Sequence, residues 1–190
     1  MARLPLTMAC GPYDRMEALS QGIVQPEGID LRYLGIQSPP EIFARMIKTN
    51  SFDVAEMSLA HYCIMRIRGE FPFVAIPVFP SRVFRHGYIF VSKSSGIKTP
   101  KDLEGKRVGV PLYTMTAAIF IRGLLQHEYG VDLKSIKWFQ GGVNQAGRDE
   151  KVKLKLPEGI SLTPVPDRSP LFPNTICPTL QAVPMLSGMS

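Results

Sequence analysis

The chain has 190 residues, of which 45% are hydrophobic and 20% are charged, and its formal net charge at pH 7 is +6. This composition is typical of a globular protein with one large or two small domains, and it excludes disordered and fibrous chains. The basic excess is spread along the chain, which argues against a nucleic-acid-binding arm. No apolar run approaches the ~20 residues that span a bilayer. We therefore expect neither nucleic acid nor membrane as a partner.

The first ten residues, MARLPLTMAC, contain a short apolar stretch that Pro5 and Thr7 interrupt. A secretory signal needs ~7–15 apolar residues, so we expect no export signal and a cytoplasmic protein. The three cysteines lie far apart without a CxxC motif, which favours reduced thiols over a disulfide framework.

In chain order, strand patterns alternate with helix patterns. Short apolar or alternating stretches predict strands at residues 4–10, 29–36, 52–57, 73–79, 88–91, 106–111, 135–139, 151–156 and 160–165. Capping residues, prolines in first turns and closing glycines predict helices at residues 14–19, 39–47, 58–67, 100–104 and 117–129. This alternation predicts an α/β fold with mostly parallel sheets.

Three of these helices begin with explicit capping signals. Ser38 precedes two prolines and Glu41, which is the pattern of a capping box. Ser58 precedes the helix at 58–67, and Thr114 or Thr116 is positioned to cap the helix at 117–129.

A second series of strands and helices begins near residue 92, so we expect two lobes. We assign residues 1–95 to the first lobe and 96–167 to a partial second lobe. After Arg168 the chain has no charged residue and four prolines. We therefore expect residues 168–190 to form an irregular, uncharged, Pro-rich tail, which is either a frame error or a natural tail, and we expect the second lobe to be incomplete.

Ligands bind beyond the carboxyl ends of parallel strands, which directs attention to residues 11–15, 56–61, 80–86 and 111–116. Residues 81–86, SRVFRH, place two guanidiniums and an imidazole in one turn. Such a turn either binds a dianion or is simply solvated. The helix start at 111–116 either binds an anion through its first N–H groups or is merely capped by threonine.

Three further side chains are candidates for acid–base chemistry. Glu56 and His61 follow the same strand, and either do acid–base work, bind a metal or lie at the surface. Asp14 either caps the next short helix or belongs to the site. Together with His86, these residues could gather a divalent cation, but their spacing matches no metal motif. We therefore predict no metal and no other cofactor.

Five separated blocks carry a resemblance to a known family. They read LTMACGPYDR (6–15), VQPEGIDLRYL (24–34), FDVAEMSLAHY (52–62), FVAIPVFPSRVFRH (73–86) and DLEGKRVGVPLYTMTAAIFIRGLLQHEYGV (102–131). In this order they resemble the 4,5-dihydroxyphthalate decarboxylase family over roughly residues 3–167. The resemblance implies a type II periplasmic-binding-protein-like fold with two lobes of mostly parallel sheet and flanking helices.

The resemblance also implies which segments bind the substrate. The corresponding substrate-binding side chains are Tyr13, Asp14, Arg15, Ser58, Arg82, Arg85, Tyr113, Thr114 and Thr116. Our own assignment of catalytic roles makes His86 the proton donor and Glu56 the base.

The implied function is the decarboxylation of a dihydroxylated aromatic dicarboxylate, such as 4,5-dihydroxyphthalate, to a dihydroxybenzoate and CO2. The expected partner is thus a small aromatic dicarboxylate or another small anion. The alternative is a binding protein, either of the ABC-transporter type or a cytosolic sensor, whose cleft closes on a small anion without chemistry. A third hypothesis is that the chain is an inactive fragment.

Overall fold

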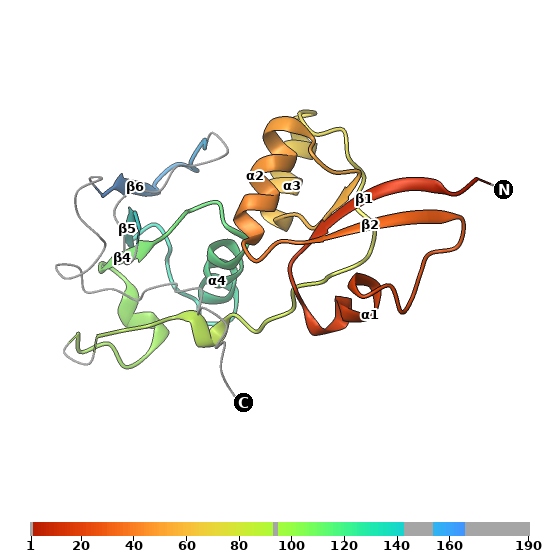
Figure 1. Ribbon diagram of the computed structural model, residues 1–190. Coiled ribbons are helices and arrows are strands. Elements are labelled where there is room, and N and C mark those ends of the chain that lie inside the picture. Colours follow the sequence, from red (N-terminus) through yellow and green to blue (C-terminus); the bar gives the residue numbers. More distant parts are fainter. Residues whose placement is uncertain (1, 93–94, 143–153, 166–190) are drawn as a thin grey trace. The chain divides into compact units, whose positions relative to one another are not determined.

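The computed structural model describes residues 2–92, 95–142 and 154–165. The chain divides into two compact units, Met1–Val83 and Phe84–Ser190. The boundary thus precedes residue 95, where we placed the end of the first lobe. Each unit contains a three-stranded parallel sheet with helices beside it (Figure 1), so the α/β class with parallel sheets is confirmed.

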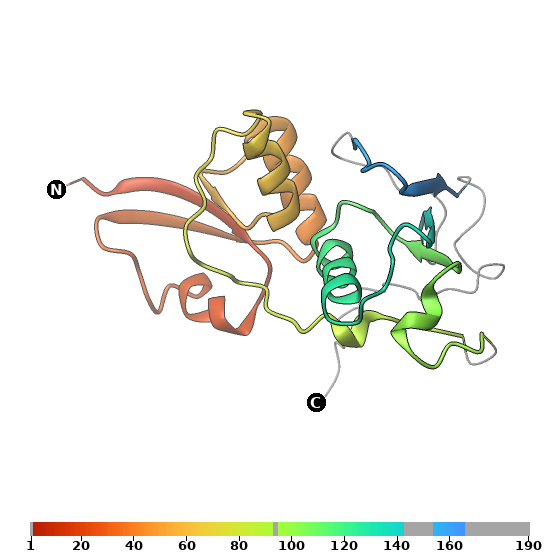
Figure 2. The same ribbon diagram turned by 180° about the vertical axis from the view of Figure 1, so that it is seen from behind.

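The first unit is built around a sheet with the order β2-β1-β3. Its strands are β1 (Leu4–Cys10), β2 (Ile29–Gly35) and β3 (Val54–Ala55). Its helices are the 3-10 turn η1 (Asp14–Met16), α1 (Glu17–Ser20), α2 (Pro39–Thr49) and α3 (Leu59–Ile67). Helices α2 and α3 lie side by side on one face of this sheet, and α1 lies on the other (Figures 1 and 2).

The core of the first unit lies between the sheet and α2. Ala9 of β1, Ile42 and Met46 of α2 and the nearby Phe52 form a buried cluster. Ile42 and Met46 are four residues apart, so both side chains lie on the same face of the helix. The apolar face of α2 therefore holds it over the central strand.

Two capping predictions in this unit have different outcomes. The Ser58 hydroxyl accepts the backbone N–H of His61 at 3.4 Å, so the predicted cap of α3 is confirmed. Ser38 is the N-cap residue of α2, but its side chain makes no capping hydrogen bond, and the predicted capping box is wrong. The reason is that Glu41 turns along the helix and pairs with Arg45 at 3.5 Å.

The second unit has a sheet with the order β4-β5-β6. Its strands are β4 (Arg107–Val110), β5 (Lys137–Gln140) and β6 (Ser161–Pro164). Its helices are the 3-10 turns η2 (His86–Tyr88) and η3 (Pro100–Leu103), and α4 (Thr116–His127). Buried side chains of α4, β4 and β5, among them Ile121, Leu125, Val110 and Trp138, form one core.

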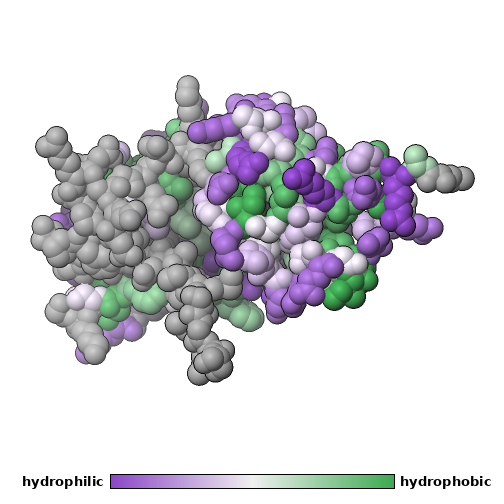
Figure 3. All heavy atoms as spheres, viewed as in Figure 1, coloured by the Kyte–Doolittle hydropathy of each residue, from purple (hydrophilic) through white to green (hydrophobic). Residues whose placement is uncertain are grey.

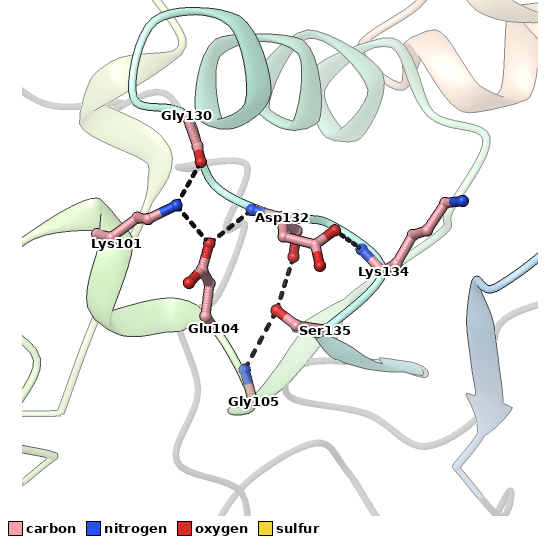
Figure 4. A network of polar contacts seen from close by, with 7 residues as sticks. All are labelled: Lys101, Glu104, Gly105, Gly130, Asp132, Lys134 and Ser135. Atoms are coloured by element: carbon pink, nitrogen blue, oxygen red, sulfur yellow. Dashed lines mark hydrogen bonds and ion pairs between the residues drawn. The ribbon is translucent and has the colours of Figure 1, made fainter.

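A polar network joins η3 to the segment that follows α4 (Figure 4). The Lys101 ammonium pairs with Glu104 at 2.7 Å and donates to the carbonyl of Gly130 at 2.6 Å. The same Glu104 oxygen accepts the backbone N–H of Asp132 at 2.7 Å, which lowers the pKa of the Glu104 carboxyl. The network therefore fixes the approach of the chain to β5.

The start of α4 differs from our expectation. Its N-cap residue is Met115, and Thr116 is the first helical residue, so the prediction that Thr114 or Thr116 occupies the cap is wrong. Thr114 is 1% exposed and is buried next to Tyr113, two residues before the first residue of the helix.

The predicted strands at 73–79 and 88–91 are also wrong. Residues 71–85 form no helix or strand, and Val74 and Ile76 are 80% and 63% exposed. Pro72 and Pro77 lack the N–H that a paired strand needs, and an apolar run alone does not supply a neighbouring strand.

On the face drawn in Figure 3, hydrophobic side chains of the first unit lie between hydrophilic ones.

The predicted tail at 168–190 and the first half of the predicted strand at 151–156 lie outside the described residues. Among the helices that the structure describes, none is long and apolar enough to cross a membrane.

Candidate functional site

The carboxylate of Glu56 lies at the carboxyl ends of β1 and β3 and is held by two donors. Its Oε1 atom accepts the backbone N–H of Gly11 at 2.6 Å, and its Oε2 atom accepts the Tyr13 hydroxyl at 2.9 Å. The Glu56 N–H donates to the Ala9 carbonyl at 3.0 Å, which extends the pairing of the two strands by one residue. The strand ends thus fix a partly buried carboxylate in one orientation.

Two residues that the sequence did not indicate complete this cluster. The hydroxyl of Tyr33, on β2, donates to the Gly11 carbonyl at 3.3 Å and contacts the buried thiol of Cys10. In the sequence both fit the apolar alternation of their strands. Only the parallel register, which places Cys10 opposite Gly35, reveals that they meet.

Burial changes the acid–base properties of the whole cluster. It raises the pKa of Glu56, while the hydrogen bonds from Gly11 and Tyr13 act in the opposite direction. Burial, reinforced by the negative charge of Glu56, raises the pKa of the Cys10 thiol to about 11 and also raises the pKa of Tyr13. Glu56, whose pKa starts far below those of the thiol and the phenols, is therefore the group of this cluster suited to act as a base.

Gly11 is required by the close approach of this cluster to the backbone. A Cβ atom at Gly11 would lie 2.9 Å from Cε2 of Tyr13 and 3.1 Å from Oε1 of Glu56. Both distances are shorter than ordinary contacts of about 3.5–4.0 Å. Any side chain at this position would displace the phenol or the carboxylate.

Arg15 places a cation beside Tyr13. Its guanidinium pairs with Asp14 at 3.3 Å and donates to the carbonyl of Pro80. It also lies 5.8 Å from the centre of the Tyr13 ring. The structure therefore brings together the predicted residues Tyr13, Asp14, Arg15 and Glu56.

The other predicted residues of the first unit have local partners. Ser58 is buried and caps α3 through its hydroxyl, and His61 is buried in the first turn of that helix. Ser81 approaches Tyr13 closely enough to form a side-chain hydrogen bond with it. Arg82 is exposed and donates to the Phe79 carbonyl at 3.0 Å.

The predicted residues of the second unit lie in two places. Arg85 lies 5.3 Å from the ring centre of Tyr88, and His86 meets Tyr129 edge to face at 6.3 Å. Tyr113 and Thr114 lie between β4 and α4, and Thr116 is the first residue of α4. The N–H of Tyr113, which could have faced an anion, instead donates to Oε1 of Gln140 at 2.7 Å.

Sequence reasoning also missed Arg122 of α4. Its guanidinium donates to the Tyr113 carbonyl at 2.9 Å and lies 3.6 Å from the centre of the Tyr113 ring. In the sequence it reads as an ordinary polar position of an amphipathic helix. One signal was present in the sequence. Arg122 follows Ala118 by four residues and precedes Leu125 by three, so it shares the helix face of these two buried residues.

Among the residues that the structure describes, no three His, Cys, Asp or Glu side chains gather closely enough to hold a metal ion. The possible cation set of Asp14, Glu56, His61 and His86 is thus not assembled as such a group.

A family model described as the periplasmic phosphonate substrate-binding protein of ABC transporters matches residues 16–156. The chain belongs to this family. Membership agrees with parallel α/β units whose polar side chains gather beyond the carboxyl ends of the strands.

Two curated relatives of this chain are named 4,5-dihydroxyphthalate decarboxylase. The resemblance seen in the sequence is therefore confirmed. The protein from Comamonas testosteroni is 46% identical over 167 residues, which are 88% of this chain and 50% of the relative. The protein from Pseudomonas putida is 39% identical over 171 residues, which are 90% of this chain and 66% of the relative. The chain thus spans about half to two thirds of the length of these relatives.

Proposed function

We propose that this chain carries out, or forms part of a protein that carries out, the decarboxylation of a 4,5-dihydroxyphthalate-like dicarboxylate to a dihydroxybenzoate and CO2. The observation that carries the proposal is the Glu56 carboxylate, held by Gly11 and Tyr13 at the carboxyl ends of parallel strands. The likeness of the chain to two proteins named 4,5-dihydroxyphthalate decarboxylase supports the choice of substrate.

The reaction requires one base and one acid. When the bond between the ring and the carboxylate breaks, CO2 leaves and the electron pair stays on the ring. A hydroxyl para to that carboxylate donates electron density as the base takes its proton, and the acid protonates the ring carbon. We assign the base to Glu56, whose pKa is raised by burial, and the acid to His86.

Binding of the dianion needs cations and N–H donors. We assign the retained carboxylate to Arg82 and Arg85, because a guanidinium binds a carboxylate through two parallel hydrogen bonds. The segment Tyr113–Thr116 is proposed to receive the second anion, and the residues lining the substrate are proposed to be Tyr13, Asp14, Arg15 and Ser58.

Three broader statements belong to the same proposal. The two compact units are interpreted as the lobes of a type II periplasmic-binding-protein-like fold. The reaction is proposed to need no metal or other cofactor. The cytoplasmic location expected from the sequence stays a prediction.

The alternative is a protein that binds a small anion without changing it. Membership in a family of substrate-binding proteins favours this alternative. Because one fold supports both functions, only the fate of the bound ligand separates them.

The decisive experiment incubates the chain with 4,5-dihydroxyphthalate and measures dihydroxybenzoate and CO2, with the Comamonas relative as the positive control. We expect product from the chain, unchanged by EDTA, and a rate lowered about 10²–10⁴-fold in Glu56→Gln, the usual contribution of a general base. Glu27→Gln, in the exposed turn before β2 and thus at the opposite end of the strands from Glu56, is the matched control and should keep the wild-type rate. Saturable binding without product would support the alternative, and neither binding nor product would reject both functions for this chain.

A further inference from the structure

Arg122 is a partly buried, charged side chain of the second unit that the proposed reaction does not use. It projects from α4 beside two aromatic rings, with its guanidinium carbon 3.6 Å from the ring centre of Tyr113 and 5.9 Å from that of Trp138. The two rings themselves meet edge to face at 5.6 Å. The guanidinium is therefore held in a defined place by its surroundings.

The charge of this guanidinium is not balanced by the residues around it. Burial lowers the pKa of Arg122, which means that its surroundings disfavour the cation. In the part of the chain that the structure describes, the ion pairs join Arg15 to Asp14, Arg45 to Glu41 and Lys101 to Glu104, and Arg122 takes part in none.

Its donors are also largely unused by the described residues. A guanidinium has five N–H donors. The hydrogen bonds of the described residues account for one of them, from Nη1 of Arg122 to the Tyr113 carbonyl at 2.9 Å. Arg122 is partly buried, and its unused nitrogens are not among the buried polar atoms without a partner, so they are reached from solvent. An oxyanion arriving from solvent would pair with the charge and accept hydrogen bonds from these donors.

The position of Arg122 in the fold agrees with a ligand site. Tyr113 follows the carboxyl end of β4, and its N–H is held by Gln140, the last residue of β5. Arg122 holds the carbonyl of the same residue. The guanidinium therefore lies at the edge of this parallel sheet where ligands bind in open α/β folds.

We propose that Arg122 binds an oxyanion, either a carboxylate or a phosphate-like group, at this edge of the second unit. The site differs from the basic turn at 81–86 and adjoins the segment Tyr113–Thr116, to which the proposed function assigns the second anion. It requires binding and not turnover, so it can be tested whether or not the chain decarboxylates a substrate.

The single tryptophan of the chain supplies the probe. Because Trp138 lies 5.9 Å from the guanidinium carbon of Arg122, an anion bound there should change its fluorescence. The experiment titrates the full chain with phthalate, benzoate and inorganic phosphate at constant ionic strength. Response to phthalate and benzoate alone identifies a carboxylate site, and response to phosphate identifies a general oxyanion site.

Variants then assign the response to Arg122. Arg122→Gln should weaken binding about tenfold to a hundredfold, the usual effect of losing a charged hydrogen bond. Arg107→Gln removes the exposed arginine at the start of β4 and should bind like the wild type. If circular dichroism shows that Arg122→Gln is unfolded, Arg122→Lys, which keeps the charge but loses the planar fork, replaces it and should also bind more weakly. The proposal is overturned if no anion gives a saturable response in the wild type, or if the folded Arg122 variant binds as tightly as Arg107→Gln.

Discussion

Substituting Gly11 by alanine should destabilise the first unit and disturb the Glu56 carboxylate at the same time. The added methyl group would lie 2.9 Å from Cε2 and 3.0 Å from Cζ of Tyr13, and 3.1 Å from Oε1 of Glu56. The ring is rigid and already hydrogen-bonded to Glu56, so neither partner moves without weakening that bond. Overpacking of this kind costs about 1–3 kcal/mol.

Gly35→Ala is a matched control because Gly35 pairs with Cys10 at the end of the neighbouring strand. A methyl group there would meet only Cε1 of Tyr33, at 4.0 Å. Without a clash, replacing glycine by alanine stabilises a protein by about 0.4–1 kcal/mol, because the unfolded chain has less freedom. The two substitutions should therefore change stability in opposite directions.

Urea unfolding followed by far-ultraviolet circular dichroism measures both effects. We expect a lower midpoint for Gly11→Ala and an equal or higher midpoint for Gly35→Ala. If both variants unfold at the wild-type midpoint or above it, the close approach at Gly11 does not constrain the site, and the argument for a fixed carboxylate is refuted.

Three further predictions concern the same cluster. Tyr13→Phe removes a donor to Glu56 and should raise the pKa of that carboxyl further, which a ¹³C NMR titration measures; an unchanged or lower pKa would contradict the hydrogen bond. Burial raises the folded-state pKa of Glu56 above its ordinary value of 4.5. The contribution of Glu56 to the free energy of unfolding is therefore fully present below pH 4.5 and is lost as the pH rises through the folded-state pKa. Glu56→Gln should therefore gain stability relative to the wild type as pH rises, and a constant difference in urea midpoints across pH would count against this. At pH 8 iodoacetamide should label the exposed Cys63 far faster than the buried Cys10. Burial raises the pKa of the Cys10 thiol from 9.0 to about 11, which lowers its thiolate fraction about a hundredfold. Peptide mass spectrometry follows both sites, and equal rates would rule out a buried Cys10.

Much of the fold could be predicted because its signals are local. The stretch at 4–10 coincides with β1, and the stretch at 29–36 exceeds β2 by one residue. The stretch at 73–79 has the same apolar character, but a strand also needs a neighbouring strand to pair with. The sequence of one short segment does not indicate whether such a neighbour is present. Pro77 was the local sign against it.

The site could be predicted only in part, because its contacts join distant residues. The strand-end rule indicated Glu56 and Tyr13, yet their hydrogen bond spans 43 positions of the chain. Tyr33 joins them only through the register of β2 against β1. For Arg122 the sequence held only its spacing from Ala118 and Leu125, because its surroundings depend on β5, whose register places Trp138 beside Val108 and near α4.

The central place of β1 in the order β2-β1-β3 has a consequence for synthesis on the ribosome. The first strand leaves the ribosome before either of its neighbours, and β3 follows only at Val54–Ala55. Until then one edge of an apolar strand stays unpaired, and parallel pairing over such separations is slow. We therefore expect the nascent chain to depend on chaperones between the emergence of β1 and that of β3, when unpaired strand edges favour aggregation.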